Sequence, residues 1–475
     1  MIDERISTGI YGMDEILDGG LIKNQAYLVR GAPGTGKTIF GLHFLTNTDE
    51  KNVFITFEET EKALKRHASA LGFNLDNVDI LDLTPASSTF SESESYDVFF
   101  SSEVEKNPLT EKIVTFIEEK KPERVFVDSL TSFGLITQDR FQFRKEVLSF
   151  INYIIDNDIT LVCTSEIIDM SNDSDLQYMV DGVMKLSKTH DRTFVNIEKY
   201  RGSDYRKGKH TCAITSKGLK VYPRLIPDRT YRRDVSKEMF SFGIPELDKL
   251  SYGGIERGTV TVISGASGCG KTTLGTKFTC EAASKGKKAL IYTFEESVSQ
   301  IKLRGDSMNI PVSNLLDSDK LVIKSIEPLR YNTDEFAYIV MNDVKNYNAS
   351  LVMIDSIVSY RMALEQAEVE RPLVSLVRFL SSKGITCLLI HEIQEIIGNF
   401  MPSGGMSFLC DNIFFLRYIE YKGELKKVIG ILKKRQGDFE KTLRLFNLTE
   451  KGIVVGKPFT ELRGLLYGVP EFTED

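Results

Sequence analysis

The sequence has no long apolar segment: it contains no run of about 18 apolar residues, the length that a helix needs to cross a bilayer. The first residues carry mixed charge and no apolar core, so we expect no secretory signal. Cysteine is scarce as well. The six cysteines form no CxxC pair, and with the five histidines they show no zinc-ligand spacing. We therefore expect a cytoplasmic protein with reduced thiols and no membrane partner.

An excess of positive charge is also missing. The formal net charge is −7, whereas proteins that bind nucleic acid rely on Lys and Arg contacts to phosphate. The hydrophobic share of 41% and the charged share of 27% are ordinary for a folded protein. These shares exclude a disordered, collagen-like or disulfide-scaffold chain, and 475 residues suffice for more than one domain.

The sequence does contain an internal repeat. Segments 5–38 and 239–272 both pass from a Gly-Ile turn through a double glycine and an apolar run into a glycine-rich loop. Four further blocks match in the same order: 53–60 with 290–297, 124–132 with 351–359, 160–166 with 386–392, and 196–202 with 430–437. The sequence therefore predicts two copies of one domain, residues 1–230 and 231–475, joined near the polar segment 226–238.

Short β-branched runs alternate with amphipathic segments in each copy. ALIYTF, LVMID and TCLLIH have strand length, whereas EVLSFINYIIDN and PLVSLVRFLSSKG have helical spacing. This alternation predicts βαβ units, and hence an α/β fold in which helices flank a mostly parallel sheet.

The glycine-rich loops GAPGTGKT (31–38) and GASGCGKT (265–272) both fit the phosphate-loop pattern GxxxxGK[ST]. Glycines let the backbone N–H groups turn toward phosphate oxygens, and the following helix adds positive potential. The lysines would reach the β- and γ-phosphates. The residues expected to bind ATP are Gly31, Gly34, Thr35, Gly36, Lys37, Thr38 and Ile39, and Gly265, Ser267, Gly268, Cys269, Gly270, Lys271, Thr272 and Thr273.

Two acidic features follow each loop. Asp128 and Asp355 end apolar strands, where such a residue often caps a turn, but after a phosphate loop it is expected to hold Mg²⁺ together with Thr38 or Thr272. The pairs Glu58-Glu59 and Glu295-Glu296 follow another strand. Acids suit the first turn of a helix, yet a water that attacks a phosphate also needs a carboxylate base. We therefore predict a catalytic role for these four glutamates.

With these motifs in this order, the chain resembles the KaiC branch of the RecA-like ATPases over nearly its whole length. The resemblance rests on the two phosphate loops, TFEE in both copies, the VDS and IDS strands, and Lys-x-Arg at EKYRG and LKKRQ. It implies two tandem RecA-like P-loop NTPase domains, a two-tiered homohexamer, and ATP with Mg²⁺ at each subunit boundary. The residues that it implies reach the neighbour's nucleotide are Lys199, Tyr200 and Arg201, and Lys433, Lys434 and Arg435.

The same resemblance implies a phosphorylation site in the second copy. Ser407 falls on the family's serine, whereas Phe408 stands where the family has a threonine, so we expect at most a single-site autokinase reaction at Ser407. We expect a nucleotide-dependent switch whose state is recognised by a signalling protein that the sequence does not identify.

Two other functions remain open. A RecA-like DNA motor or recombinase needs basic or aromatic channel loops, whereas the corresponding segments 166–181 and 392–412 contain no Lys or Arg. Nucleic acid is therefore not an expected partner. A scaffold in which one copy binds ATP without hydrolysing it is the second alternative, although both copies keep every motif residue.

Overall fold

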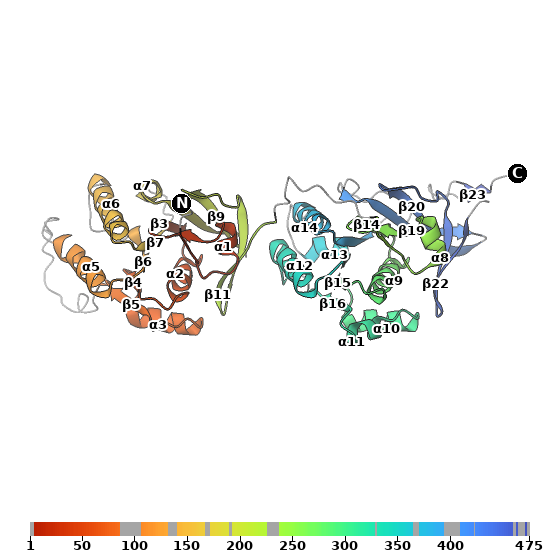
Figure 1. Ribbon diagram of the computed structural model, residues 1–475, viewed down its shortest axis with the longest axis horizontal. Helices are drawn as coiled ribbons and strands as arrows, with labels where there is room; N and C mark the ends of the chain where they lie inside the picture. The colour runs from red at the N-terminus through yellow and green to blue at the C-terminus, as the bar shows by residue number, and fades with distance from the viewer. Residues whose placement is uncertain are drawn as a thin grey trace. The chain divides into compact units, whose positions relative to one another are not determined.

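The computed structural model describes residues 4–85, 106–131, 140–166, 172–189, 192–225, 237–327, 330–363, 370–393, 409–421, 423–458, 462–463 and 471–472. The chain divides into two compact units, Met1–Arg224 and Leu225–Asp475, which are the first and second domains below (Figure 1).

The first domain is built on a sheet with nine described strands. In spatial order they are β11 (Gly218–Tyr222), β10 (Lys209–Thr215), β9 (Arg192–Tyr200), β8 (Gly182–Thr189), β3 (Ala26–Gly31), β7 (Thr160–Glu166), β6 (Arg124–Asp128), β4 (Asn52–Thr56) and β5 (Val78–Asp82). The strands from β8 to β5 are parallel, and β9 to β11 continue the sheet antiparallel. A short ribbon pairs β1 (Arg5–Ile6) with β2 (Leu21–Ile22).

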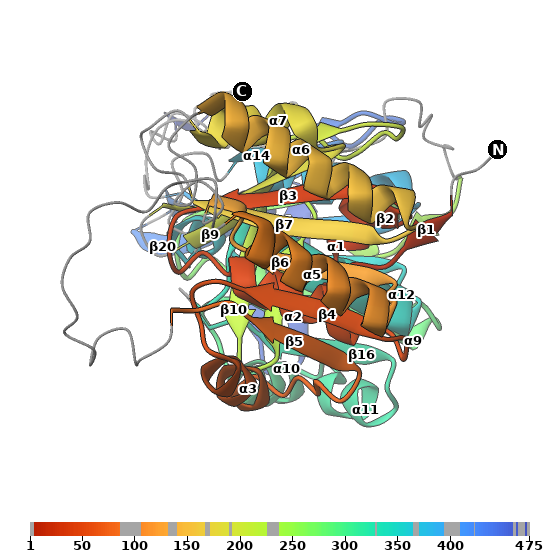
Figure 2. The ribbon, with the colours of Figure 1, turned by 90° about the vertical axis from the view of Figure 1, so that its left-hand side faces the viewer.

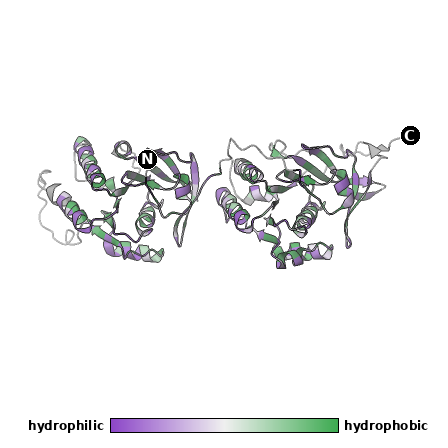
Figure 3. Cartoon of the chain, viewed as in Figure 1, coloured by the Kyte–Doolittle hydropathy of each residue, from purple (hydrophilic) through white to green (hydrophobic). Residues whose placement is uncertain are grey.

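Helices cover both faces of this sheet (Figures 1 and 2). On one face lie α5 (Lys106–Lys120), α6 (Arg140–Asp156) and α7 (Asn172–Met179), and on the other lie α1 (Met13–Ile16), α2 (Lys37–Thr46) and α3 (Glu61–Ala70). Successive strand residues point to opposite faces. Ala26 and Leu28 therefore pack in the core beneath α5, α6 and α7, whereas Tyr27 and Val29 pack in the core beneath α1, α2 and α3. Because helices cover both faces, the central strands are apolar along most of their length (Figure 3).

The second domain repeats this topology strand for strand. Its described strands run β16 (Leu321–Ser325), β15 (Ala289–Thr293), β17 (Leu351–Asp355), β18 (Thr386–Glu392), β14 (Val260–Gly265), β19 (Asn412–Tyr421), β20 (Glu424–Lys434), β21 (Arg444–Thr449) and β22 (Gly452–Pro458). The short ribbons are β12 (Met239–Phe240) with β13 (Ile255–Glu256), and β23 (Leu462–Arg463) with β24 (Glu471–Phe472). The predicted fold class, two tandem RecA-like α/β domains, is confirmed.

The helices of the second domain also form two layers. On one face lie α8 (Pro245–Leu250), α9 (Lys271–Ser284), α10 (Val298–Ser307) and α11 (Val312–Asp317), and on the other lie α12 (Thr333–Tyr347), α13 (Ile357–Ala363) and α14 (Glu370–Ser382). Local sequence sets their starts: the Ser297 hydroxyl oxygen accepts a hydrogen bond from the Gln300 N–H, and Gln300 Oε1 accepts one from the Ser297 N–H, a capping box that begins α10.

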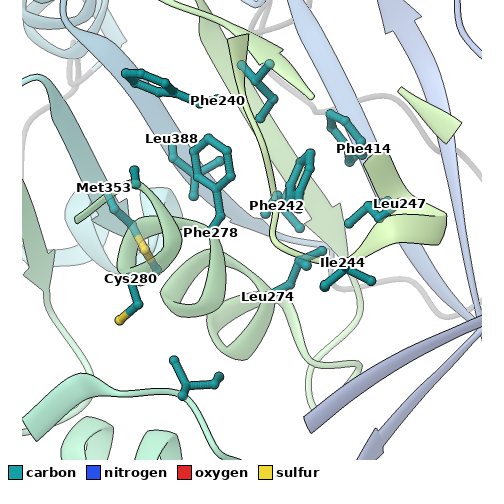
Figure 4. Packing of buried hydrophobic residues seen from close by; sticks show 14 of the residues in the cluster. Phe240, Phe242, Ile244, Leu247, Leu274, Phe278, Cys280, Met353, Leu388 and Phe414 are labelled. Atoms are coloured by element: carbon teal, nitrogen blue, oxygen red, sulfur yellow. The ribbon is translucent and has the colours of Figure 1, made fainter. Parts of the chain in front are cut away.

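An aromatic cluster fixes the helix that follows the second glycine-rich loop. The Phe242 ring lies between Phe278 of α9 and Phe414 of β19, at centroid distances of 4.8 and 5.1 Å (Figure 4). Leu274 and Phe278 are fully buried. Since α9 starts at Lys271, this core sets the position of the loop that precedes the helix.

Candidate functional site

The first glycine-rich loop connects the carboxyl end of β3 to the start of α2. Gly34 and Gly36 have φ values of 74° and 97°, which are readily adopted only by glycine. Lys37 folds back over the loop, and its Nζ donates to the Gly31 carbonyl oxygen at 2.9 Å. The loop thus holds a buried cation beside the N–H groups of a helix N-terminus, which suits an anion.

The second loop has the same backbone path, with φ values of 73° at Gly268 and 105° at Gly270. Lys271 donates to the Ala266 carbonyl oxygen at 2.7 Å and also lies 3.6 Å from Glu392 at the end of β18. No such ion pair is recorded for Lys37 among the described residues. The two loops therefore match in shape, but a carboxylate at ion-pair distance is seen only at Lys271 among the described residues.

The strand-end aspartates lie next to the loops, as the order of the motifs predicted. The Thr38 hydroxyl donates to Asp128 Oδ2 at 2.7 Å, and Thr164 donates to the other carboxylate oxygen at 2.5 Å. In the second domain the Thr272 hydroxyl bonds Asp355, whose pKa burial raises to about 7, with Glu296 and Glu295 adding to the rise. Each domain thus pairs a hydroxyl from a helix start with a buried carboxylate.

A close helix–strand approach makes these contacts possible. A Cβ at Gly41 of α2 would lie 2.2 Å from the Phe126 ring of β6, and one at Gly275 of α9 would lie 2.8 Å from Met353 of β17. Glycine therefore lets each loop helix approach the strand that ends in aspartate. Neither glycine was predicted from the sequence to belong to the site, although glycine stands four residues after the lysine in both copies.

The oxygen donors at these sites fit Mg²⁺. The ion prefers oxygen ligands, takes one or two from the protein, and completes its shell with water and substrate phosphates. In each domain a threonine hydroxyl and an aspartate carboxylate, already in contact, offer such a pair. The described part of the chain holds no group of three His, Cys, Asp or Glu side chains that would form an all-protein metal cage.

The structure separates the two glutamates of the first pair. Glu58 accepts a hydrogen bond at 2.9 Å from Ser129, the residue after Asp128. Loss of hydration around its carboxyl group raises the pKa of Glu58, and the charges of Asp128 and Glu166 add to the rise. Glu59 instead lies 3.1 Å from His67 on α3. Only Glu58 faces the Asp128 end of the sheet.

In the second pair Glu295 occupies the position of Glu58, while the charge of Glu296 also acts on Asp355. Glu295 accepts a hydrogen bond at 2.9 Å from Ser356, the residue after Asp355, and another from Ser359. Glu296 pairs with Arg304 on α10. The serines that orient the first glutamates were missed, although the VDS and IDS motifs placed them beside the aspartates.

The Lys-x-Arg segments lie at the opposite end of the sheet from the loop in their own domain. In the first domain Tyr200 pairs in register with Gly182, which pairs with Tyr27 near the start of β3, and Arg201 N–H donates to Asp181. The loop begins at Gly31, where β3 ends. Four residue steps along β3 separate Tyr27 from Gly31, about 13 Å at roughly 3.3 Å per residue.

The second domain repeats this placement. Arg435 N–H donates to Asp411, whose own N–H donates to Val260 at the start of β14. A register shift lies at the same point in both domains, between Val183 and Met184 and between Ile413 and Phe414, just before the Lys-x-Arg segment of the partner strand. Such bulges re-aim the side chains next to them.

The outer residues of each segment are accessible cations held by their own domain. Lys199 donates to the carbonyl oxygens of Gln177 and Val180 at 2.9 and 2.5 Å, and burial together with Arg201 lowers the pKa of Lys199. The exposed Arg201 lies 3.7 Å from Asp181. In the second domain, burial and Arg435 lower the pKa of Lys433, and Arg435 lies 3.6 Å from Asp411.

The middle residues point the other way, into the domain. The Tyr200 hydroxyl donates to the Gly20 carbonyl oxygen at 2.6 Å in the buried core. Lys434 Nζ lies 3.1 Å from Glu256. Their side chains are therefore occupied within their own chain.

Some predicted residues lie outside the part of the chain that the structure describes. These are Ser407 with its neighbour Phe408, and residues 167–171 and 394–408 of the two channel segments. Among the helices that are described, none is long and apolar enough to span a membrane. All six cysteines are described, and each is a buried free thiol.

Comparison with known proteins agrees with this geometry. The family model described as "ATPase: KaiC" matches residues 6–226 and again residues 240–459. The circadian clock oscillator protein KaiC of Parasynechococcus marenigrum (strain WH8102) is 27% identical over 486 residues, which cover 98% of this chain and 93% of that protein. The circadian clock protein KaiC3 of Synechocystis sp. is 26% identical over 489 residues, which cover 99% of this chain and 95% of that protein.

The resemblance inferred from the motifs is thereby confirmed over both copies. A family of ATPases supports ATP binding and ATPase activity in general for this chain. The chain belongs to the KaiC ATPase family.

Proposed function

We propose that the protein hydrolyses MgATP at the boundaries between identical subunits of a double-ring hexamer. One observation carries this proposal: each Lys-x-Arg segment lies at the end of its sheet opposite its own phosphate loop. Cations on a segment centred about 13 Å from its own loop along the strand can act on ATP only if the nucleotide belongs to another subunit. A ring of like subunits supplies such a neighbour at every position.

The roles within one site follow from the contacts. Lys37 and Lys271, together with the loop N–H groups, would hold the phosphates, and Thr38 with Asp128, or Thr272 with Asp355, would hold Mg²⁺. When bound, Mg²⁺ neutralises charge on the β- and γ-phosphate oxygens. Glu58 and Glu295 would orient the attacking water and take its proton.

The remaining groups have distinct roles. Glu59 and Glu296, which were predicted from the sequence to be catalytic, would instead hold α3 and α10 through His67 and Arg304. Lys199 with Arg201, and Lys433 with Arg435, would stabilise charge that develops on the neighbour's γ-phosphate.

Such a ring would serve as a nucleotide-dependent switch in the cytoplasm. Because each site takes parts from two subunits, ATP would join neighbouring domains and ADP would loosen them. A protein partner that distinguishes the two states would then respond to hydrolysis. The curated relatives named circadian clock proteins support a signalling role of this kind.

Subunit mixing tests the shared site in the second domain. All chains carry Lys37→Ala to silence the first domain, and one set adds Lys271→Ala while the other adds Arg435→Ala. Each set alone should lack ATPase activity. Co-expressed in equal amounts, they should recover about a quarter of the rate, because a working site needs an intact loop from one chain and an intact cation from another. Absence of recovery, or a monomer in light scattering with MgATP, would contradict the shared site.

Phosphorylation of Ser407 stays a prediction from the sequence. It would need a general base, and Glu295 would supply one. Incubation with MgATP followed by mass spectrometry of the peptide that contains Ser407 tests it, and an unmodified peptide would leave a pure ATPase.

A further inference from the structure

The middle residue of the second Lys-x-Arg segment makes a buried ion pair that the ATPase motifs do not explain. Lys434 ends β20, and its side chain is only 3% exposed. Its Nζ lies 3.1 Å from Glu256 Oε1 and donates to the Ser251 carbonyl oxygen at 2.6 Å. Glu256 is 8% exposed. Burying two charges is expensive unless their geometry is good, so replacing such a pair by apolar residues often costs little stability.

This pair attaches the Lys-x-Arg segment to the segment from α8 to β13. Ser251 follows α8 and is fully buried, and Glu256 belongs to β13. Farther along the chain, Glu440 N–H donates to the Leu250 carbonyl oxygen at 2.9 Å. The segment is therefore held to α8–β13 both at Lys434 and after Arg435.

The other side of the segment is fixed by backbone contacts. Arg435 N–H donates to the Asp411 carbonyl oxygen, and Asp411 accepts at 2.8 Å from the Val260 N–H through its carboxylate. Adjacent strand residues alternate in direction, so holding Lys434 inward directs Lys433 and Arg435 outward. Two independent anchors thus set the direction of the outer cations.

The first domain holds the same position with different chemistry. Tyr200 stands in place of Lys434 and donates to the Gly20 carbonyl oxygen at 2.6 Å. Arg5 donates to the same oxygen at 3.2 Å and to Ser203 at 2.6 Å, just beyond Arg201. In the ribbon register Ile22 occupies the position of Glu256. Both domains therefore fix the inward side chain to the short ribbon, one through a phenol and an arginine, the other through an ion pair.

We propose that Lys434 and Glu256 are positioning residues for ATP hydrolysis in the adjacent subunit. They do not touch that nucleotide but set the direction of Lys433 and Arg435. Arg5 and Tyr200 do the same for Lys199 and Arg201. This inference rests on the shared site proposed above.

The test replaces both partners, since removing one would leave a buried unpaired charge. In the Lys37→Ala background, Lys434→Met with Glu256→Leu should fold and bind a fluorescent ATP analogue at the second loop with unchanged Kd and KM. Its kcat should fall about 10- to 100-fold, the loss expected from a small misplacement of catalytic groups. The matched control, Lys426→Met with Glu424→Leu, removes an exposed pair elsewhere on β20 and should keep its kcat. Unchanged kcat in the first double variant, or loss of ATP binding together with kcat, overturns the positioning role.

Subunit mixing separates this role from a structural one. Chains with Lys434→Met and Glu256→Leu, co-expressed with Lys271→Ala chains, should recover about a quarter of the rate, because the defect lies in the neighbour's site. If the pair merely supports its own domain, no recovery follows, since the only intact loops then lie in the damaged domains. If ATPase activity recovers when Lys271→Ala chains are mixed with Arg435→Ala chains, but not when they are mixed with this double variant, the positioning role alone is overturned. Failure of both mixtures overturns the shared site as well.

Discussion

The different roles proposed for Glu58 and Glu59 can be tested by substituting each glutamate separately. The two glutamates are adjacent in sequence, but Glu58 accepts from Ser129 beside Asp128, whereas Glu59 lies 3.1 Å from His67 on α3. With the second domain silenced by Lys271→Ala, we expect Glu58→Gln to lower kcat about 10²- to 10⁴-fold, the usual contribution of a general base. ATP binding should persist because the loop is intact.

The matched variant Glu59→Gln sets the scale for a structural effect. It removes one partner of a surface contact in which the side chain of His67 is 51% exposed and that of Glu59 39% exposed. Pairs of this kind contribute less than about 1 kcal/mol. We therefore expect a change in kcat of at most about fivefold. The two substitutions are chemically identical and lie one residue apart. The ratio of the two kcat values therefore measures the effect of where the carboxylate lies, because the loss of a carboxylate is common to both variants.

The pH dependence of the rate supplies a second readout. A base acts only when it is deprotonated, and the pKa of Glu58 is raised by lost hydration. The kcat of the first domain should therefore fall as the pH decreases through that raised pKa, and Glu58→Gln should lack this acid limb. Stopped assays of phosphate release between pH 5 and pH 8 measure both effects. Equal losses in the two variants, or an acid limb that survives in Glu58→Gln, would refute this assignment.

Two further predictions concern the first domain. Burial lowers the pKa of His43 to about 4, and its neutral Nε2 accepts from the Leu219 N–H, so the stabilising contribution is complete above the unfolded pKa of 6.5 and is lost as the pH falls toward 4. Urea unfolding should show a loss of about 2 kcal/mol between pH 7 and pH 5 that His43→Gln lacks; an equal loss in this variant would contradict the assignment. Gly41→Ala should cost about 1–3 kcal/mol by overpacking against Phe126 and weaken ATP binding in calorimetry, whereas wild-type affinity would show that α2 can retreat without disturbing Thr38.

The repeat, the α/β class and the local chemistry of each loop follow from the order of the residues alone. A glycine-rich loop after a strand must turn its N–H groups outward, and an aspartate at the end of a parallel strand must lie at the same sheet edge. Such motifs are short and their geometry is set by residues close in sequence. For this reason the contact between Thr38 and Asp128 could be anticipated.

The use of each side chain depends instead on how distant segments pack together. Sequence gives Glu58 and Glu59 the same chemistry, but their partners, Ser129 and His67, come from different elements. In the sequence, Lys434 is indistinguishable from the two cations beside it, Lys433 and Arg435. Its contact with Glu256, which is far away in sequence, shows that Lys434 is buried. The distance between the Lys-x-Arg segment and its own loop likewise depends on strand order. Direction, burial and long-range pairing arise when distant segments pack together, so no local pattern could specify them.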